Sequence, residues 1–216
     1  MVLKLYKMDT SPPVRACMML CDLLNVPVEM IEVDLFKGEH MNPDFVKKNP
    51  LHTVPVLEDG DLILQDSHAI LMYLAGVYDK QNSLYPKDLK QRALVDQKLF
   101  FNISILFMRL RNISYPLLME QVKPTENRFK DLDEAYGFLE LFLSHTKYLA
   151  GSNMTIADIA AYATTSSLGF LLELDGHKYP KLQAWMKEME QLPCATKYNA
   201  PGVQKYKEFI TGLLAA

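Results

Sequence analysis

Hydrophobic and polar positions alternate in short stretches over the first eighty residues of the chain. Four segments have the pattern of β-strands: 2–6, 28–33, 54–57 and 62–64. Three segments have apolar residues at helical spacing or a helix-opening Asn-Pro pair: 12–24, 42–48 and 66–78. The order βαβ, short helix, ββα predicts a right-handed parallel crossover followed by an antiparallel hairpin.

The pattern changes after residue 80. The stretch 81–87 has no periodicity and contains turn formers, so we interpret it as a linker between domains. Beyond it, only helical patterns remain, over 88–121, 125–146, 155–172, 179–191 and 203–214. The chain is therefore expected to be α/β plus all-α, with a small α/β domain at 1–80 and an all-helical domain at 88–216.

Composition and charge exclude several classes. With 216 residues, 49% hydrophobic and 23% charged, the chain can bury an ordinary core. A net charge of −3 argues against a nucleic-acid partner. No apolar run approaches the roughly 20 residues of a membrane span, and the first 20 residues contain Asp9, two prolines and Arg15 where a signal peptide is apolar. We therefore expect a cytoplasmic protein with no membrane partner.

The segment from Asp9 to Arg15 joins the first strand to the first helix. Ser11 stands before Pro12, so its simplest role is to cap the helix. A hydroxyl at a helix N-terminus is also suited to holding an anion, and a thiolate is such an anion. The local sequence leaves both roles open.

A second candidate segment runs from Asn49 to Leu57. Pro55 cannot donate to a strand ladder, so it lies at an edge or follows a cis bond that exposes the backbone of Val54. His52 precedes it on a loop, where a lone histidine is most often only solvated. A third segment begins a helix at Asp66 and Ser67, which either cap that helix or hold the two charges of a zwitterion.

Other motifs point to structure rather than chemistry. Thr155 and Asp158 have the spacing of a capping box at the start of a buried helix. Cys17 and Cys21 lie four apart on one helix face and are expected in the core. The five histidines have no metal-ligand spacing, and the sequence contains no phosphate-binding loop or dinucleotide fingerprint, so no metal is expected.

Taken in order along the whole chain, these motifs resemble those of the cytosolic glutathione transferases, and look most like the insect epsilon class within the delta/epsilon group. The matching stretches are Leu5-Tyr6, Ser11–Ala16, Gly38–His40, Asn49–Leu57, Asp66–Ile70, Ser83–Pro86, Leu149–Gly151 and Thr155–Asp158. The resemblance implies a thioredoxin-like N-terminal domain, an all-helical C-terminal domain, a homodimer, and glutathione as co-substrate.

The resemblance also implies roles for individual residues. It assigns Ser11 to the glutathione thiol and Val54, before a cis Pro55, to the cysteinyl backbone. The remaining glutathione contacts that it implies are His40 and His52 at the glycine end, Asp66 and Ser67 at the γ-glutamyl end, and His68 as a further contact. Asp66 stands where glutamate is commoner in the family. A pocket for the hydrophobic electrophile is implied near Phe36, Phe107, Met108, Arg111, Tyr115 and Met119, four of which share one helical face.

A hydroxyl at a helix N-terminus can supply enough free energy to stabilise the glutathione thiolate. A free thiol with a pKa near 8.5 is mostly protonated at neutral pH, and lowering that pKa by about two units requires roughly 2.7 kcal/mol. A hydrogen bond to a charged group supplies about 1.5–3 kcal/mol, and a helix N-terminus adds up to about 1–2 kcal/mol. Ser11 then acts as a donor, and the thiolate attacks an electrophilic carbon.

Three alternatives to conjugation remain open at this point. The same thiolate could serve a glutathione-dependent isomerase, peroxidase or dehydrochlorinase with an endogenous, for example sterol-like, substrate. The chain could instead be a non-catalytic carrier of hydrophobic ligands or an assembly module. A thiol transferase would need a cysteine at position 11, which is serine here, so only Cys17 could revive that reading.

Overall fold

A four-stranded mixed sheet forms the centre of the N-terminal half. The computed structural model describes residues 2–215. Its strands are β1 (Leu3–Lys7), β2 (Val28–Glu32), β3 (Val56–Asp59) and β4 (Leu62–Gln65), in the order β2-β1-β3-β4. β1 runs parallel to β2, pairing Leu5 with Met30, and β3 is antiparallel to both β1 and β4. The parallel crossover and the antiparallel hairpin are therefore both confirmed.

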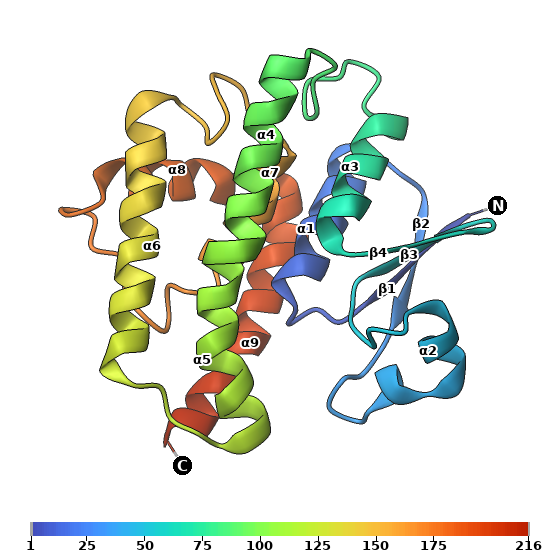
Figure 1. Cartoon of the computed structure of the whole chain (residues 1–216), viewed down its shortest axis with the longest axis horizontal. Coiled ribbons are helices and arrows are strands. Elements are labelled where there is room, and N and C mark those ends of the chain that lie inside the picture. Colours follow the sequence, from blue (N-terminus) through green and yellow to red (C-terminus); the bar gives the residue numbers. More distant parts are fainter. Residues whose placement is uncertain (1, 216) are drawn as a thin grey trace.

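Helices α1 (Pro12–Leu23) and α3 (Ser67–Tyr78) lie between this sheet and the helical half, whereas α2 (Pro43–Lys48) lies away from them at the lower right of Figure 1. A single 3₁₀ turn, Glu39–Met41, precedes α2. The face of α1 that carries Val14, Cys17 and Cys21 is buried, as the apolar spacing predicted.

The remainder of the described chain is helical. Its elements are α4 (Leu89–Phe101), a π-helical turn (Asn102–Leu106), α5 (Phe107–Glu120), α6 (Glu126–His145), α7 (Ile156–Thr165), α8 (Pro180–Glu190), a second π-helical turn (Ala195–Asn199) and α9 (Ala200–Ala215). A thioredoxin-like domain thus precedes an all-helical one, and α9 lies beside α1 in Figure 1.

Three segments have boundaries that differ by two residues or more from those expected from the pattern. The third strand begins at Val56 rather than 54, because Pro55 has no N–H for the ladder. The helix expected over 155–172 ends at Thr165, where Ser166, Ser167 and Gly169 are poor helix formers. The last helix begins at Ala200 rather than 203, since Pro201 is tolerated in a first helical turn.

Asp158 holds the start of α7, as the capping-box spacing predicted. Its buried carboxylate accepts hydrogen bonds from the Thr155 N–H at 2.9 Å, the Thr155 hydroxyl at 3.0 Å, the Leu149 N–H at 2.9 Å and the Trp185 indole at 3.2 Å. One side chain therefore joins the loop before α7, α7 itself and α8. The segment between α3 and α4 is tied to the start of the same helix, because the Leu84 carbonyl accepts the Ile156 N–H at 3.0 Å.

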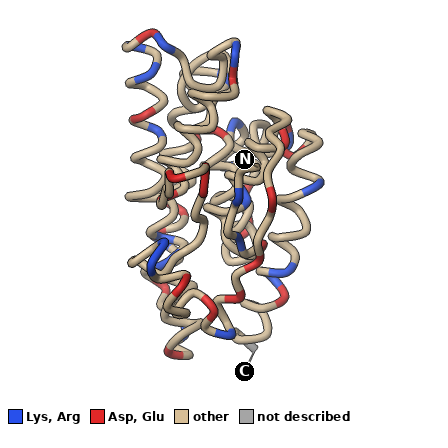
Figure 2. The backbone as a smooth tube through the Cα atoms, turned by 90° about the vertical axis from the view of Figure 1, so that its right-hand side faces the viewer, with Lys and Arg blue, Asp and Glu red and all other residues tan. Residues whose placement is uncertain are grey.

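Charged side chains are spread over the molecule. In Figure 2, basic and acidic residues are interspersed along the backbone rather than gathered by sign, which agrees with the near-neutral net charge of −3. Among the described residues, no helix combines the length and apolar character needed to cross a bilayer.

Candidate functional site

Ser11 stands at the N-terminal end of α1 with its hydroxyl uncommitted. Its backbone N–H donates to the Met8 carbonyl at 3.0 Å and its carbonyl accepts the Arg15 N–H at 3.0 Å, but its side chain makes no capping hydrogen bond. The simple capping role is therefore not used. Pro12 and Pro13 occupy the first two helical positions and have no N–H, so this helix end offers an anion fewer backbone donors than usual. The hydroxyl becomes the principal donor here.

The backbone at Val54 is free to pair with a ligand. The Val54–Pro55 peptide bond is cis, as the resemblance implied. Within residues 2–215, neither the N–H nor the C=O of Val54 has a main-chain partner, because β3 begins two residues later. An extended peptide ligand can pair with such groups as an added strand does.

His40 and His52 lie close together beside this loop. Their ring centroids are 6.1 Å apart. The Nδ1 atom of His40 is buried and has no hydrogen-bond partner among the described residues. Because buried polar atoms are normally paired, this nitrogen is suited to form a hydrogen bond with a bound ligand.

Asn49 shapes the loop that carries His52, a role that the sequence pattern did not reveal. This buried side chain donates to the Thr53 carbonyl at 2.8 Å and accepts the Leu51 N–H at 3.0 Å, while its own carbonyl accepts the His52 N–H at 2.9 Å. His52 has a positive φ of 45°, which these bonds stabilise. The Asn49-Pro50 pair in the sequence gave no sign of this network.

Asp66 and Ser67 begin α3. One carboxylate oxygen of Asp66 caps the helix by accepting the His68 N–H at 2.8 Å and the Ala69 N–H at 3.3 Å. The other oxygen, Oδ2, has no hydrogen bond within the described chain, and the side chain is 56% exposed. Interactions with His68 lower the pKa of the Asp66 carboxyl although partial burial opposes them, so it remains ionised near neutral pH. Asp66 can therefore cap α3 with one carboxylate oxygen and bind a cation with the other.

His68 is buried and faces the helical half. Its Nε2 lies 3.1 Å from Nδ2 of Asn102, in the π-helical turn after α4, and its Nδ1 lies 3.4 Å from the Ser67 hydroxyl. The His68 ring thus contacts Ser67 of the N-terminal half through one nitrogen and Asn102 of the helical half through the other. A direct contact of His68 with glutathione stays a prediction, since both ring nitrogens already have neighbours.

The residues expected around the electrophile occupy two places. Phe36 follows β2 and stacks on Phe209 of α9, with ring centroids 4.3 Å apart; both rings are substantially exposed. Phe209 is a candidate that the sequence reasoning missed, because a single aromatic residue in a terminal helix has no distinguishing pattern.

One face of α5 is open to solvent rather than part of the core. It carries Met108, Arg111, Tyr115 and Met119, all of them exposed, and the Arg111 guanidinium lies 4.3 Å from the centre of the Tyr115 ring. Phe107 is half-buried and packs against the core. The apolar and cation–π character of this face suits an aromatic electrophile.

The cysteines are not placed for thiol exchange. Cys17, Cys21 and Cys194 are free and buried. Burial raises the pKa of the Cys17 thiol well above its usual value, and raises that of Cys21 to about 12 and that of Cys194 to about 11. These thiols stay protonated and unreactive at neutral pH. The residues described by the structure contain no cluster of potential metal ligands.

The two-part fold is that of a glutathione-dependent transferase. The model of the glutathione S-transferase N-terminal domain matches residues 5–82, and that of the C-terminal domain matches residues 100–193. The chain belongs to the glutathione S-transferase family, is an enzyme of that class and uses glutathione as co-substrate.

Individual relatives agree with this assignment. The chain is 41% identical to glutathione S-transferase 1 of Manduca sexta over the full length of both proteins. An epsilon-class glutathione S-transferase from the housefly Musca domestica superposes with a TM-score of 0.96 at 43% identity, covering 98% of each chain. A glutathione transferase homologue from Drosophila mojavensis, solved with bound glutathione, gives a TM-score of 0.95 at 40% identity and covers 98% of this chain and 97% of that one. The likeness to insect transferases, including the epsilon class, is thus confirmed.

Proposed function

We propose that Ser11 donates a hydrogen bond to the glutathione sulfur and so keeps it as a thiolate, which attacks the electrophilic carbon of an apolar substrate. The observation that carries this role is the Ser11 hydroxyl, which stands at a helix N-terminus without a capping bond. Because Pro12 and Pro13 remove two backbone donors, most of the roughly 2.7 kcal/mol needed for a shift of two pKa units must come from the hydroxyl. The macrodipole of α1 supplies the rest.

The neighbouring groups suit the other parts of glutathione. The free backbone of Val54 pairs with the cysteinyl residue, and the uncommitted oxygen of Asp66 binds the γ-glutamyl ammonium. Ser67 and the N-terminus of α3 receive the γ-glutamyl carboxylate. The glycine carboxylate lies against His40 and His52, which gives the buried Nδ1 of His40 a partner.

We further propose that the electrophile lies between the exposed face of α5 and the stacked pair Phe36 and Phe209. Methionine and aromatic side chains adapt to differently shaped ligands, which fits a detoxifying enzyme with a broad substrate range. Conjugation is favoured over isomerase, peroxidase or dehydrochlorinase activity, since the chain is similar over its length to proteins named as transferases.

A cytosolic homodimer is the assembly that we propose. Exposed apolar side chains occur on three elements of one region of the chain, β4, α3 and α4, and include Ile63, Val77, Leu94 and Phe100. Such side chains support an apolar interface. Three free cysteine thiols suit a reducing compartment.

Steady-state conjugation of an activated aryl chloride tests this function. Ser11→Ala is expected to lower kcat/KM by about 10- to 100-fold, the loss of a hydrogen bond to a charged group. Thr10→Ala removes the neighbouring hydroxyl and is expected to keep wild-type rates. Equal rates for wild type and Ser11→Ala would contradict the role of Ser11, whereas glutathione binding without turnover by the wild type would favour a carrier.

A further inference from the structure

The loop before Ser11 is held by a fully buried arginine. Arg15, in α1, is 0% exposed. Its Nη1 donates to the carbonyls of Asp9 at 3.2 Å and Thr10 at 2.8 Å, the two residues that precede Ser11. The guanidinium therefore fixes the main chain from which the Ser11 hydroxyl projects.

The other side of the same guanidinium is fixed by the helical half. Its Nε donates to Oδ1 of Asn199 at 2.9 Å, and its Nη2 donates to the Ala163 carbonyl at 3.1 Å and to the Ser167 hydroxyl. Burial lowers the pKa of Arg15 to about 10, which still leaves it charged at neutral pH. A planar fork with five donors can satisfy all these acceptors at once, whereas an ammonium group cannot.

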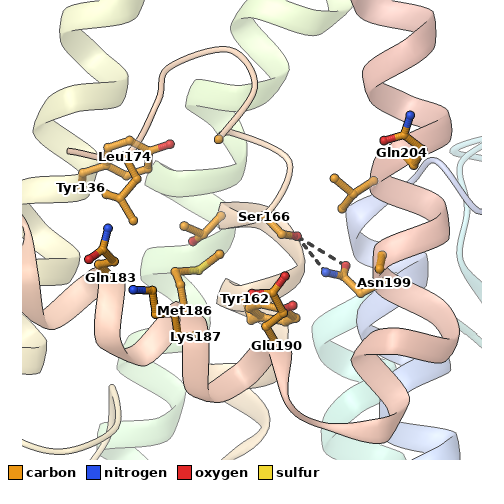
Figure 3. A pocket seen from close by; sticks show the side chains of 14 residues that line it. Tyr136, Tyr162, Ser166, Leu174, Gln183, Met186, Lys187, Glu190, Asn199 and Gln204 are labelled. Atoms are coloured by element: carbon orange, nitrogen blue, oxygen red, sulfur yellow. Dashed lines mark hydrogen bonds between the residues drawn. The ribbon is translucent and has the colours of Figure 1, made fainter. Parts of the chain in front are cut away.

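Asn199 is itself held in one orientation. Its Nδ2 donates to the Ser166 hydroxyl at 3.0 Å, and Figure 3 shows the two side chains bonded on the wall of a cavity of about 310 Å³ in the helical half. Asn199 is 1% exposed, so its carbonyl oxygen has little freedom to turn from Arg15. A continuous series of hydrogen bonds thus leads from the helical half, through Asn199 and Arg15, to the backbone beside Ser11.

Helix α9 adds an outer contact to the same loop. Lys205 forms an ion pair with Asp9 at 2.6 Å, and Lys7 approaches the same carboxylate at 2.6 Å from β1. These pairs are partly exposed and are expected to contribute little by themselves. The buried guanidinium is therefore the principal restraint on the loop.

We propose that Arg15 is a positioning residue for the transfer reaction, and that Asn199 orients it from the helical half. Within the part of the chain that the structure describes, the Ser11 side chain makes no capping hydrogen bond, so the position of its hydroxyl depends on the backbone of residues 9–11. A hydrogen bond weakens steeply when its geometry is lost, so a displaced loop would leave the sulfur less stabilised. This inference rests on the proposed role of Ser11.

The test combines kinetics with a titration of the thiol of bound glutathione, followed by thiolate absorbance. Asn199→Ala removes the acceptor from Arg15, and is expected to raise the pKa of the bound thiol by about one unit. It should also lower kcat about tenfold, with KM for glutathione changed less than about twofold. Asn199→Asp retains an acceptor for Arg15 and is expected to restore both values. Arg15→Lys keeps the charge without the fork and should resemble Asn199→Ala.

Leu139→Ala is the control for a merely structural effect. Leu139 is buried in α6, away from the loop, so this variant should be less stable and yet keep the wild-type thiol pKa. If Asn199→Ala titrates like the wild type while Ser11→Ala does not, the positioning role fails and the proposed function stands. If Ser11→Ala itself titrates like the wild type, the proposed function fails. If Arg15→Lys does not fold, the thiol pKa of Asn199→Ala still tests the positioning role of Arg15.

Discussion

Gly202 of α9 allows the last helix to pass directly against the loop that carries Ser11. A Cβ atom at this position would lie 2.3 Å from the Asp9 carbonyl oxygen and 2.4 Å from Cδ of Arg15. Both distances are far below van der Waals contact, and one of the two atoms belongs to the backbone. The Gly202→Ala substitution must therefore displace the loop, the helix or both.

The magnitude follows from two opposing terms. Overpacking a close contact costs about 1–3 kcal/mol, and a backbone atom cannot relieve the clash by changing rotamer. Replacing glycine by alanine inside a helix returns about 0.5–1 kcal/mol. We expect Gly202→Ala to lower the free energy of unfolding by about 1–2 kcal/mol, and to lower kcat because the loop beside Ser11 moves.

Urea denaturation and steady-state kinetics measure these effects. Gly212 provides the matched control, since it lies in the same helix and a Cβ added there would meet no described atom within 4 Å beyond the neighbouring backbone of the helix itself. Gly212→Ala is expected to raise the free energy of unfolding by about 0.5–1 kcal/mol and to leave kcat unchanged. If Gly202→Ala proved as stable and as active as Gly212→Ala, the close approach of α9 to the Ser11 loop would be wrong.

Three further predictions concern pH, folding and substrate binding. Burial alone would raise the pKa of Asp9, but hydrogen bonds from Lys205 and Lys7 outweigh it and lower the pKa, so its contribution to the free energy of unfolding is present above about pH 4 and is lost as the pH falls through the folded-state value. Asp9→Asn should therefore be less stable than wild type at pH 7 in urea melts, and the difference in stability should shrink as the pH falls below about 4; a difference that stays constant would refute this. Asp158→Asn places an amide donor against other donors in the α7 cap and should lower the free energy of unfolding by about 2–4 kcal/mol, so an unchanged urea midpoint would contradict the cap. Phe209→Ala removes an aromatic wall and should raise KM for a bulky aromatic electrophile about 3- to 10-fold while KM for glutathione stays constant; a parallel rise in both would place Phe209 elsewhere.

Local patterns predicted most of the elements because each has a local cause. The spacing of apolar residues places α1 and α3, and the Thr155 and Asp158 pair marks the start of α7. Proline was harder to interpret. Because of Pro55, β3 begins only at Val56, yet Pro201 is accommodated in the first turn of α9. The same residue type excludes a ladder bond in one place and costs nothing in the other.

The candidate glutathione residues were predicted from a family resemblance rather than from the physics of single motifs. Each motif alone had an ordinary structural role, and the structure shows Asp66 performing its capping role with one oxygen while the other stays free. Asn49, Asn199 and Gly202 could not be recognised in the sequence. Their importance comes from contacts between distant segments, such as the 184 positions that separate Arg15 from Asn199.

The pKa of the glutathione thiol in the binary complex tests the central claim most directly. Thiolate absorbance is followed against pH for the wild type and for Ser11→Ala, each saturated with glutathione. Stabilisation by the hydroxyl predicts a wild-type pKa about two units below that of the free thiol, and a value for Ser11→Ala that returns most of the way to it. Identical titration curves for the two proteins, or a wild-type curve that coincides with free glutathione, would contradict the account.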